Sequence, residues 1–230
     1  MPTVEHTLGQ IKSGSVYTKL DANCGFYQME LSPECRKLTT FITPVGRFMF
    51  KRLPYGIASA PEVYQKKMNE ILSGIPNVIC HMDDIIIATS PENYTKTLKV
   101  VLDRLSKEGV TLNKDKCVFS ATKIDYLGQI ISNQGVSKDP KKVQAIVKYS
   151  APKDVTELRR FLGMANQLMK FSPKLAEHTQ PLRALLKKDN EWRWGPDQEN
   201  SFNRIKEDLS SDIVLAMYSP GQRNRRLREQ

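Results

Sequence analysis

The stretch of sequence that decides the fold runs from Val78 to Ala88 and reads Val-Ile-Cys-His-Met-Asp-Asp-Ile-Ile-Ile-Ala. Two short apolar runs, rich in the β-branched residues that favour strands, flank the adjacent acids Asp83 and Asp84. Two neighbouring aspartates inside so apolar a stretch break the usual strand pattern, and such breaks concentrate at tight turns and functional sites. We therefore predict a β-hairpin whose turn carries both aspartates.

A third acid, Asp21, follows the short β-prone run Tyr-Thr-Lys-Leu at 17–20 and precedes a turn that contains Gly25. In a split βαβ sheet this first strand and the hairpin can lie side by side at the centre, which would bring Asp21 close to Asp83. Clustered carboxylates repel one another, and a hard divalent cation removes that cost. The pattern therefore predicts either a Mg²⁺ site suited to phosphoryl transfer or three ordinary turn aspartates at the surface.

Strand and helix patterns alternate over the first 136 residues. Apolar residues at helical spacing predict a short helix over 3–12, a helix from Ala60 with Val63, Met68, Ile71 and Leu72 facing inward, and a helix over 94–107. β-prone runs predict an extended segment over 28–31, a hairpin over 38–50, and strands over 118–119 and 124–131. The order β-α-β-β-α-β predicts an α+β fold, a split βαβ antiparallel sheet with helices on one face.

From Asp139 onward the apolar spacing is helical. Pro140 begins a predicted helix over 140–149, and Asp154 or Thr156 can cap a second helix over about 154–170. Further elements are predicted as helices over 181–188 and 197–210, a strand over 213–217, and a basic tail from 222. A helical module therefore follows the predicted sheet.

Charge is distributed unevenly along the chain, whose formal net charge is +10. Residues 1–136 carry 16 basic and 13 acidic side chains, whereas residues 137–190 carry 12 basic and 5 acidic ones. Residues 191–222 carry 3 basic and 6 acidic side chains, and the last eight residues carry four arginines and one glutamate. The surplus over 137–190 indicates a polyanionic partner such as nucleic acid, and a solvated basic helix face is the alternative.

The composition excludes several classes of protein. With 230 residues, 40% hydrophobic and 26% charged, the chain is globular in character, and no apolar run approaches the ~20 residues that a membrane span needs. The first residues do not have the pattern of a secretory signal. The four cysteines show no C-x-x-C spacing, so we expect neither a zinc site nor a disulfide framework, and we expect a reducing compartment.

Five segments in the right order resemble motifs of the reverse transcriptases of Ty3/gypsy-type LTR retrotransposons. They are 19–28 (motif A), 38–61 (motif B), 80–85 (motif C), 109–117 (motif D) and 125–128 (motif E). The resemblance extends from about residue 2 to about residue 220. It implies an RNA-directed DNA polymerase fragment of a pol polyprotein, with a reverse-transcriptase palm and a remnant of the fingers over 1–136. A helical thumb would follow over 137–190, and the start of a connection or ribonuclease H-like region would occupy 191–230.

The resemblance also implies a role for each matching residue. Asp21, Asp83 and Asp84 would be catalytic and, with the carbonyl of Ala22, would bind two Mg²⁺ ions, for which Mn²⁺ could substitute. The other implied roles are nucleotide binding by Gly25, Phe26, Tyr55 and Gly56, proton donation by Lys116, a primer grip at Leu127 and Gly128, and duplex contacts from Arg159, Arg160, Gly163 and Asn166. Phe26 would reject a 2′-hydroxyl, and a plain core aromatic is its alternative. A solvated lysine and a solvated helix face are the alternatives for Lys116 and the arginine pair.

The implied partners are an RNA or DNA template–primer duplex and deoxynucleoside triphosphates, without a membrane. The implied location is the cytoplasm, within a virus-like particle, or the nucleus. His81 stands where the family pattern has tyrosine, and we do not expect it to bind Mg²⁺, which prefers oxygen ligands. The fingers strands that the family has before motif A have no counterpart in the sequence, so we expect poor nucleotide binding. The aspartate that opens the ribonuclease H site has no counterpart either, so we expect no ribonuclease H activity. The alternative functions are a catalytically silent nucleic-acid-binding remnant and a product that does not fold stably.

Overall fold

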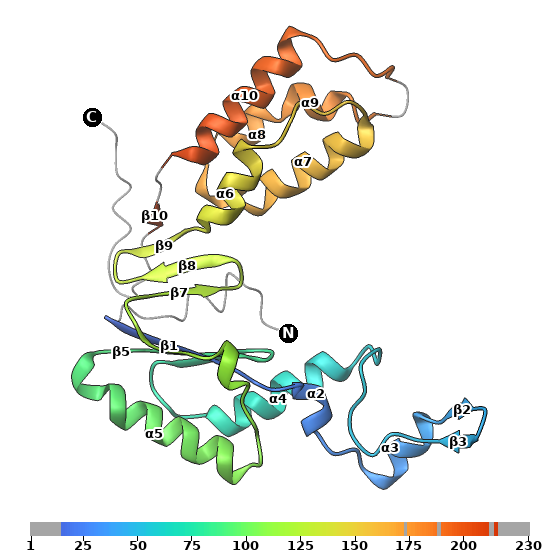
Figure 1. Cartoon of the computed structure of the whole chain (residues 1–230), viewed down its shortest axis with the longest axis vertical. Helices are drawn as coiled ribbons and strands as arrows, with labels where there is room; N and C mark the ends of the chain where they lie inside the picture. The colour runs from blue at the N-terminus through green and yellow to red at the C-terminus, as the bar shows by residue number, and fades with distance from the viewer. Residues whose placement is uncertain (1–14, 173, 188–189, 212–213, 216–230) are drawn as a thin grey trace. The chain divides into compact units, whose positions relative to one another are not determined.

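The computed structural model describes residues 15–172, 174–187, 190–211 and 214–215. Figure 1 shows the chain, which divides into two compact units, the first running to Tyr126 and the second beginning at Leu127. Each unit has its own hydrophobic core. The predicted helix over 3–12 and the basic tail lie outside the described residues. No helix in the described part of the chain is long and apolar enough to cross a membrane.

A four-stranded antiparallel sheet forms the centre of the first unit. Its strands are β1 (Val16–Asp21), β4 (Val78–His81), β5 (Asp84–Thr89) and β6 (Val118–Ala121), in the order β4-β5-β1-β6. Helix α4 (Ala60–Leu72) precedes the β4–β5 hairpin, and helix α5 (Pro91–Lys107) follows it. This connectivity is the split βαβ arrangement, so the predicted α+β fold is confirmed.

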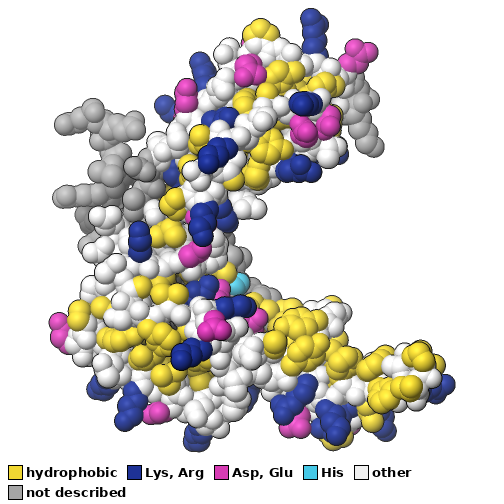
Figure 2. Space-filling model, viewed as in Figure 1, with side chains coloured by type: hydrophobic (Ala, Val, Ile, Leu, Met, Phe, Trp, Pro, Cys, Tyr) yellow, Lys and Arg dark blue, Asp and Glu magenta, His cyan; other side chains and the backbone are white. Residues whose placement is uncertain are grey.

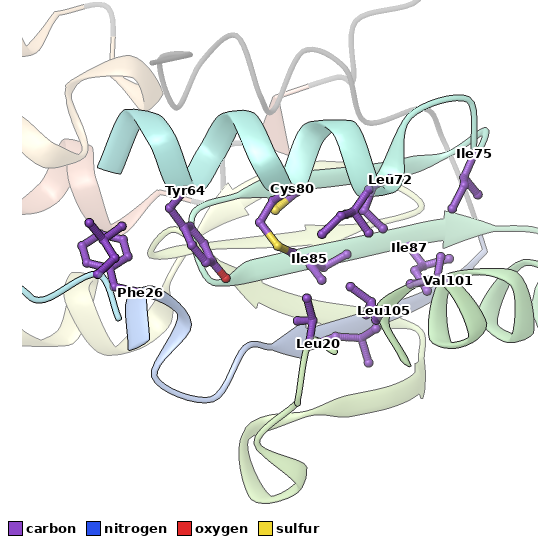
Figure 3. Close-up of a cluster of buried hydrophobic side chains, with 14 of the residues drawn as sticks. Leu20, Phe26, Tyr64, Leu72, Ile75, Cys80, Ile85, Ile87, Val101 and Leu105 are labelled. Atoms are coloured by element: carbon purple, nitrogen blue, oxygen red, sulfur yellow. The ribbon is translucent and has the colours of Figure 1, made fainter. Parts of the chain in front are cut away.

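The two helices bury their apolar stripes against one face of this sheet (Figure 3). The stripe of α4 includes Tyr64 and Met68, both fully buried, whereas Val63 is 53% exposed. The inward orientation predicted for Val63 is therefore wrong. Val63 lies about 100° around the helix from Tyr64, so its side chain falls beyond the edge of the apolar stripe. Helix α5 contributes Val101 and Leu105 to the same core, and its chain reverses at Gly109, whose φ is +72°.

The segment between β1 and α4 contains two short helices and a hairpin. They are α2 (Gly25–Gln28), α3 (Pro33–Leu38), β2 (Phe41–Thr43) and β3 (Gly46–Phe48). The predicted hairpin over 38–50 is confirmed. The extended segment predicted over 28–31 is wrong only at Gln28, which ends α2. Glu30 forms a bridge with Arg52, and Met29 and Leu31 on either side of it hydrogen-bond to the same neighbouring segment through their backbones. Figure 2 shows hydrophobic side chains gathered over this hairpin, where Ile42 is 76% exposed.

The first unit ends with η1 (Lys114–Lys116) and β7 (Lys123–Tyr126), and the second begins with β8 (Gln129–Ser132) and β9 (Gly135–Lys138). The single strand predicted over 124–131 is therefore wrong. Leu127 and Gly128 have φ values of +50° and +74°, which reverse the chain between β7 and β8. Strand β10 (Val214–Leu215) pairs with β9 within the second unit.

Helices make up most of the second unit. They are α6 (Pro140–Val147), α7 (Val155–Gln167), η2 (Met169–Phe171), α8 (Leu175–His178), α9 (Gln180–Ala184) and α10 (Pro196–Ser210). The Asp154 carboxylate caps α7 by accepting a hydrogen bond of 2.8 Å from the Glu157 amide. The predicted helix over 154–170 ends at Gln167. Of the helix predicted over 181–188, α9 forms only the first part, and the short helix α8 before it was not predicted.

The compact units divide the chain at other positions than the predicted domains. The aromatic ring of Phe202 in α10 packs on Phe161 of α7, with centroids 4.6 Å apart, and Trp194 packs on Phe202. Residues on both sides of the predicted boundary at 190–191 thus share one core. The β8–β9 hairpin likewise belongs to the helical unit by its contacts. Palm, thumb and connection remain predicted names for the parts.

Candidate active site

The ends of β1 and β5 bring the three predicted acids together. Asp21 is the last residue of β1 and lies directly opposite Asp84, the first residue of β5. The amide of Ala22 donates a hydrogen bond of 2.8 Å to the carbonyl of Asp83. The predicted side-by-side arrangement of the first strand and the hairpin is confirmed. The turn itself consists of Met82 and Asp83, so Asp84 belongs to the strand and not to the turn as predicted.

The turn is held in a strained conformation. Met82 has a φ of +54° at the first position of a two-residue turn, where glycine is the usual residue, and a left-handed conformation costs an L-residue about 1–2 kcal/mol. The Cys80 thiol donates a hydrogen bond of 3.2 Å to the Met82 carbonyl. Burial, reinforced by the charges of Asp83 and Asp84, raises the pKa of this thiol to about 12, so it keeps the proton that it donates.

Asp83 carries a buried, unsatisfied oxygen. Oδ1 of Asp83 and the Tyr64 hydroxyl both lie buried beside Gly25. Neither atom forms a well-aligned hydrogen bond with any described residue, although the hydroxyl is close enough to the carboxylate to interact with it. Burial raises the pKa of the Asp83 carboxyl above its usual value, and the charges of Asp21 and Asp84 raise it further. The Tyr64 hydroxyl and the Lys116 ammonium act in the opposite direction without reversing the shift. A half-buried carboxylate repelled by two others is the electrostatic condition that a bound cation relieves.

Gly25 lies against Asp83 with no room for a side chain. A Cβ atom at Gly25 would lie 2.1 Å from Oδ1 of Asp83 and 2.5 Å from the Tyr64 hydroxyl. Glycine is required here by the close approach of these atoms and not by a positive φ. The structure thus places one predicted nucleotide-site residue in direct contact with a predicted catalytic acid.

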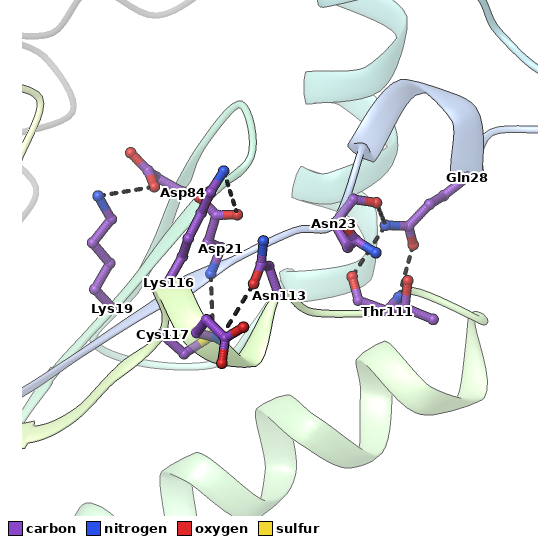
Figure 4. Close-up of polar contacts among 10 residues, drawn as sticks. Lys19, Asp21, Asn23, Gln28, Asp84, Thr111, Asn113, Lys116 and Cys117 are labelled. Atoms are coloured by element: carbon purple, nitrogen blue, oxygen red, sulfur yellow. Dashed lines mark hydrogen bonds and ion pairs between the residues drawn. The ribbon is translucent and has the colours of Figure 1, made fainter.

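Two lysines face the other two carboxylates (Figure 4). Nζ of Lys19 lies 3.1 Å from Oδ1 of Asp84, and Nζ of Lys116 lies 3.6 Å from Oδ1 of Asp21. The Lys116 side chain is 65% exposed, so its pairing adds little stability and leaves the ammonium open to solvent. Our sequence reasoning missed Lys19. The signal that could have found it is the strand period of two, which puts Lys19 and Asp21 on the same face.

Hydrogen bonds attach the loop that carries Lys116 to the end of β1. The Asn113 amide donates to the carbonyl of Asp21 over 2.8 Å. The side chain of Gln28 joins the same two segments, because its amide nitrogen donates to the carbonyls of Asn23 and Thr111 and its oxygen accepts from the Thr111 amide (Figure 4). The position of Lys116 beside Asp21 therefore depends on contacts that link distant parts of the sequence.

Aromatic side chains border the acids. Phe26 is 7% exposed, and its ring centroid lies 5.0 Å from that of Tyr55 and 5.4 Å from that of Tyr64. Tyr55 is 54% exposed. Partial burial of its hydroxyl and the negative charge of Asp83 raise the pKa of this group. Gly56 follows with a φ of +92° and open space where its Cβ would be. Of the predicted nucleotide-binding residues, Gly25, Phe26 and Tyr55 therefore gather around Asp83.

The donor set suits Mg²⁺, although the side chains are turned elsewhere. Three carboxylates and the Ala22 carbonyl are the oxygen ligands that Mg²⁺ takes. The unsatisfied oxygen of Asp83 supports this fit. Among the described residues, however, no three His, Cys, Asp or Glu side chains are grouped so that they could hold a metal ion. Two of the three carboxylates are ion-paired with lysines, Asp21 with Lys116 and Asp84 with Lys19.

The remaining predicted site residues belong to the second unit. Leu127 and Gly128 form the turn before β8. Arg159, Arg160, Gly163 and Asn166 are all exposed on α7. A Cβ atom at Gly163 would meet nothing within 4 Å in the described part of the chain beyond the helix itself, so none of those residues requires glycine there. The structure therefore gathers the catalytic and nucleotide-site predictions in one unit and the primer-grip and thumb predictions in the other.

Comparison with known sequences supports this arrangement of motifs. The family described as reverse transcriptase (RNA-dependent DNA polymerase) matches residues 2–131. The Transposon Tf2-3 polyprotein of Schizosaccharomyces pombe is 34% identical to this chain over 218 residues, which is 94% of this chain and 16% of that relative. The Transposon Tf2-7 polyprotein matches to the same extent. The chain thus spans less than a fifth of the length of the curated relatives that it matches.

Solved structures share the fold. The foamy viral protease-reverse transcriptase in complex with dsDNA has a TM-score of 0.89 at 20% identity, covering 96% of this chain and 47% of that chain. The same viral protein in complex with RNA/DNA hybrid has a TM-score of 0.84 at 22% identity, covering 92% of this chain and 30% of that chain. At these identities the likeness establishes the fold alone.

Proposed function

This chain belongs to the reverse transcriptase family, and from that premise we propose that Asp21, Asp83 and Asp84 form the active centre of an RNA-directed DNA polymerase within a retrotransposon polyprotein. The observation that carries the proposal is their convergence at the ends of β1 and β5, with a buried oxygen of Asp83 left unsatisfied. Carboxylates held together against their mutual repulsion are costly, and such clusters concentrate at functional sites.

The proposed reaction is the attack of a primer 3′-hydroxyl on the α-phosphate of a deoxynucleoside triphosphate, with release of pyrophosphate. Mg²⁺ ions held by Asp21, Asp83, Asp84 and the Ala22 carbonyl would supply Lewis-acid stabilisation of the phosphoryl oxygens. Lys116, exposed and 3.6 Å from Asp21, would donate a proton to the leaving pyrophosphate. Lys19 would keep the Asp84 carboxylate oriented through its 3.1 Å contact.

The aromatic side chains beside Asp83 would form the nucleotide site. Tyr55 offers an exposed ring, and Gly56 leaves open space next to it. Phe26 is buried and its ring packs on that of Tyr55. The bulk of Phe26 would limit the space for the sugar of the incoming nucleotide and thereby exclude a 2′-hydroxyl. The burial of Phe26 also fits the alternative of a plain core aromatic, and substrate selection is the property that separates the two.

The exposed surface of α7 would bind the template–primer duplex. Arg159 and Arg160 can contact phosphates, and Gly163 would let a duplex approach the helix backbone. Glycine inside a helix costs about 1 kcal/mol relative to alanine, and no described residue outside the helix occupies the space above Gly163. The structurally similar foamy viral proteins, which are in complex with dsDNA and with RNA/DNA hybrid, support a duplex partner. The cytoplasmic, particle-associated or nuclear location remains part of this proposal.

Primer extension tests the proposed activity. Purified chain would be incubated with poly(rA)·oligo(dT), dTTP and Mg²⁺, beside the Asp83→Asn variant, and duplex binding would be measured in parallel by fluorescence anisotropy. We expect extension by the wild type, loss of extension in the variant, and equal binding by both. Extension that is equal in both chains would contradict the assignment of Asp83.

A second candidate function is a catalytically silent nucleic-acid-binding fragment. It is favoured by the orientation of Asp21 and Asp84 towards lysines and by the absence of a three-ligand metal group among the described residues. A wild-type chain that binds duplex in a salt-dependent manner but adds no nucleotide would favour this function over polymerisation.

A further inference from the structure

Gln65 is a polar residue on the inward stripe of α4. Met68 and Leu72, its neighbours at helical spacing, are buried core residues, and Gln65 itself is 3% exposed. A buried amide is costly unless its oxygen and its nitrogen both find hydrogen-bond partners. The partners of this side chain therefore indicate why the core contains an amide at this position.

The amide of Gln65 bonds to both residues that flank His81. Its oxygen accepts a hydrogen bond of 2.7 Å from the backbone amide of Met82, and its nitrogen donates one of 2.9 Å to the carbonyl of Cys80. The same nitrogen donates to Oδ1 of Asn69 on the exposed side, over 2.8 Å. One side chain thus joins α4 to the end of β4 and to the first residue of the Met82–Asp83 turn.

The turn has few other restraints at this point. Strand pairing between β4 and β5 ends with His81 opposite Asp84, so the Met82 amide lies outside the ladder. Met82 adopts a φ of +54°, which its side chain disfavours. Without the acceptor on Gln65, the Met82 amide would lose its hydrogen bond and the backbone could relax towards negative φ.

Any such relaxation would move Asp83. Asp83 follows Met82 directly, and its Oδ1 packs so closely on Gly25 that no methyl group would fit between them. The Ala22 amide bonds to the Asp83 carbonyl, which couples the turn to the end of β1 next to Asp21. The place of one acid relative to the other therefore depends on the conformation of Met82.

We propose that Gln65 is a positioning residue, which holds Met82 in its left-handed conformation and thereby sets the place of Asp83 relative to Asp21 in the polymerase reaction. This inference rests on the proposed function. Gln65 acts through the backbone of Cys80 and Met82, and its hydrogen bonds do not reach the carboxylates themselves. It is distinct from the residues that the family motifs suggested.

The test combines amide hydrogen exchange with kinetics on the full chain. Gln65→Met keeps a long unbranched side chain in the core and deletes both hydrogen bonds to the hairpin. We expect exchange of the Met82 amide to become about tenfold faster or more, while the Ile86 amide in the middle of β5 keeps its rate. We expect kcat for nucleotide addition to fall by roughly 10- to 100-fold, with KM for the nucleotide within about threefold of the wild-type value.

Two further variants separate positioning from general stability. Asn69→Ala removes the outer partner of Gln65 without touching the turn, so we expect wild-type exchange and wild-type kcat. Gln65→Glu retains an oxygen that can accept from the Met82 amide but loses the donor to the Cys80 carbonyl. Relative to Gln65→Met, we therefore expect it to restore part of the protection of the Met82 amide and part of kcat. If Gln65→Met fails to fold, the Gln65→Glu variant and the protection of Met82 in the wild type still test the proposal.

Three results would overturn the inference. The Met82 amide of the wild type could exchange as fast as an exposed turn amide, or Gln65→Met could keep both wild-type exchange and wild-type kcat. The third is a fall in kcat in Gln65→Met that only matches the loss of folded protein measured by thermal unfolding. Failure of the proposed function has a different signature. The wild-type chain would then add no nucleotide, while the exchange rates would still decide whether Gln65 holds the turn.

Discussion

The two compact units arrange their charges in opposite ways. In the first unit three carboxylates converge at the ends of two central strands, and one oxygen of Asp83 stays buried and unsatisfied. In the second unit basic side chains are dispersed over helices and the segments between them, with Arg159 and Arg160 exposed on α7 and Lys153 exposed ahead of it. Convergent charges cost free energy, whereas dispersed surface charges cost little. The difference suggests that polar substitutions in the first unit affect catalysis and that those in the second affect binding.

The largest expected effect comes from Asp83→Asn. The substitution keeps the shape of the side chain and removes its negative charge, so we expect primer extension to fall by roughly 10²–10³-fold or more, since electrostatic groups at a reacting centre carry effects of this size. Asp103→Asn, at an exposed acid on α5, is the matched control and should leave extension unchanged. Duplex binding should stay within about threefold of wild type in both variants, because binding is assigned to the other unit.

The same glycine-to-alanine change in each unit sharpens the comparison. Gly25→Ala forces a methyl group against Asp83 and Tyr64, so we expect a loss of about 1–3 kcal/mol in the free energy of unfolding and at least a tenfold fall in extension. Gly163→Ala meets open space, so we expect a gain of about 0.5–1 kcal/mol and weaker duplex binding. Denaturant titration measures the free energy of unfolding of each variant, and fluorescence anisotropy measures its duplex binding. Equal destabilisation by the two changes would contradict the contrast between a close-packed site and an open surface.

A smaller effect is expected from Arg159→Ala combined with Arg160→Ala. If both side chains contact phosphates, the slope of log affinity against log salt should decrease by about 1.8, because each lost phosphate contact removes about 0.9. The double variant Lys96→Ala with Lys99→Ala, at exposed positions of α5 in the first unit, is the charge-matched control and should keep the wild-type slope. A wild-type slope in the arginine variant would show that Arg159 and Arg160 do not contact the phosphates of the duplex.

The smallest effect concerns pH. Because the pKa of Asp83 is raised in the folded chain, its ionised form disfavours folding, and this cost grows as the pH rises through the folded pKa. In metal-free buffer the wild type should therefore gain unfolding free energy relative to Asp83→Asn when the pH is lowered from 7 towards 4. Urea titrations with EDTA at both pH values measure the difference. A gap between the two proteins that stays constant with pH would contradict the raised pKa.

Local patterns predicted much of the first unit. The apolar runs around Asp83 predicted the hairpin, apolar spacing predicted α4 and most of α5, and the order of elements predicted the sheet. These features follow from the periods of strands and helices, which a short window of sequence contains. Two predictions were wrong for local reasons as well, the inward orientation of Val63 and the single strand over 124–131. The residue pattern gives only a weak signal for the edge of an apolar helix stripe and for the turn formed by Leu127 and Gly128.

The sequence by itself therefore determined the elements, their order, the family and the acids that the chemistry would need. Only the tertiary structure decided that Asp21 faces Asp84, that Gly25 lies under Asp83, and that Gln65 reaches the Met82 amide. Gln65 could have been singled out as a polar residue on an apolar stripe, but its partner could not. The physical reason is that strand register and the close approach of buried atoms are set by packing between segments far apart in the chain, whereas periodicity reports only which face of an element is buried.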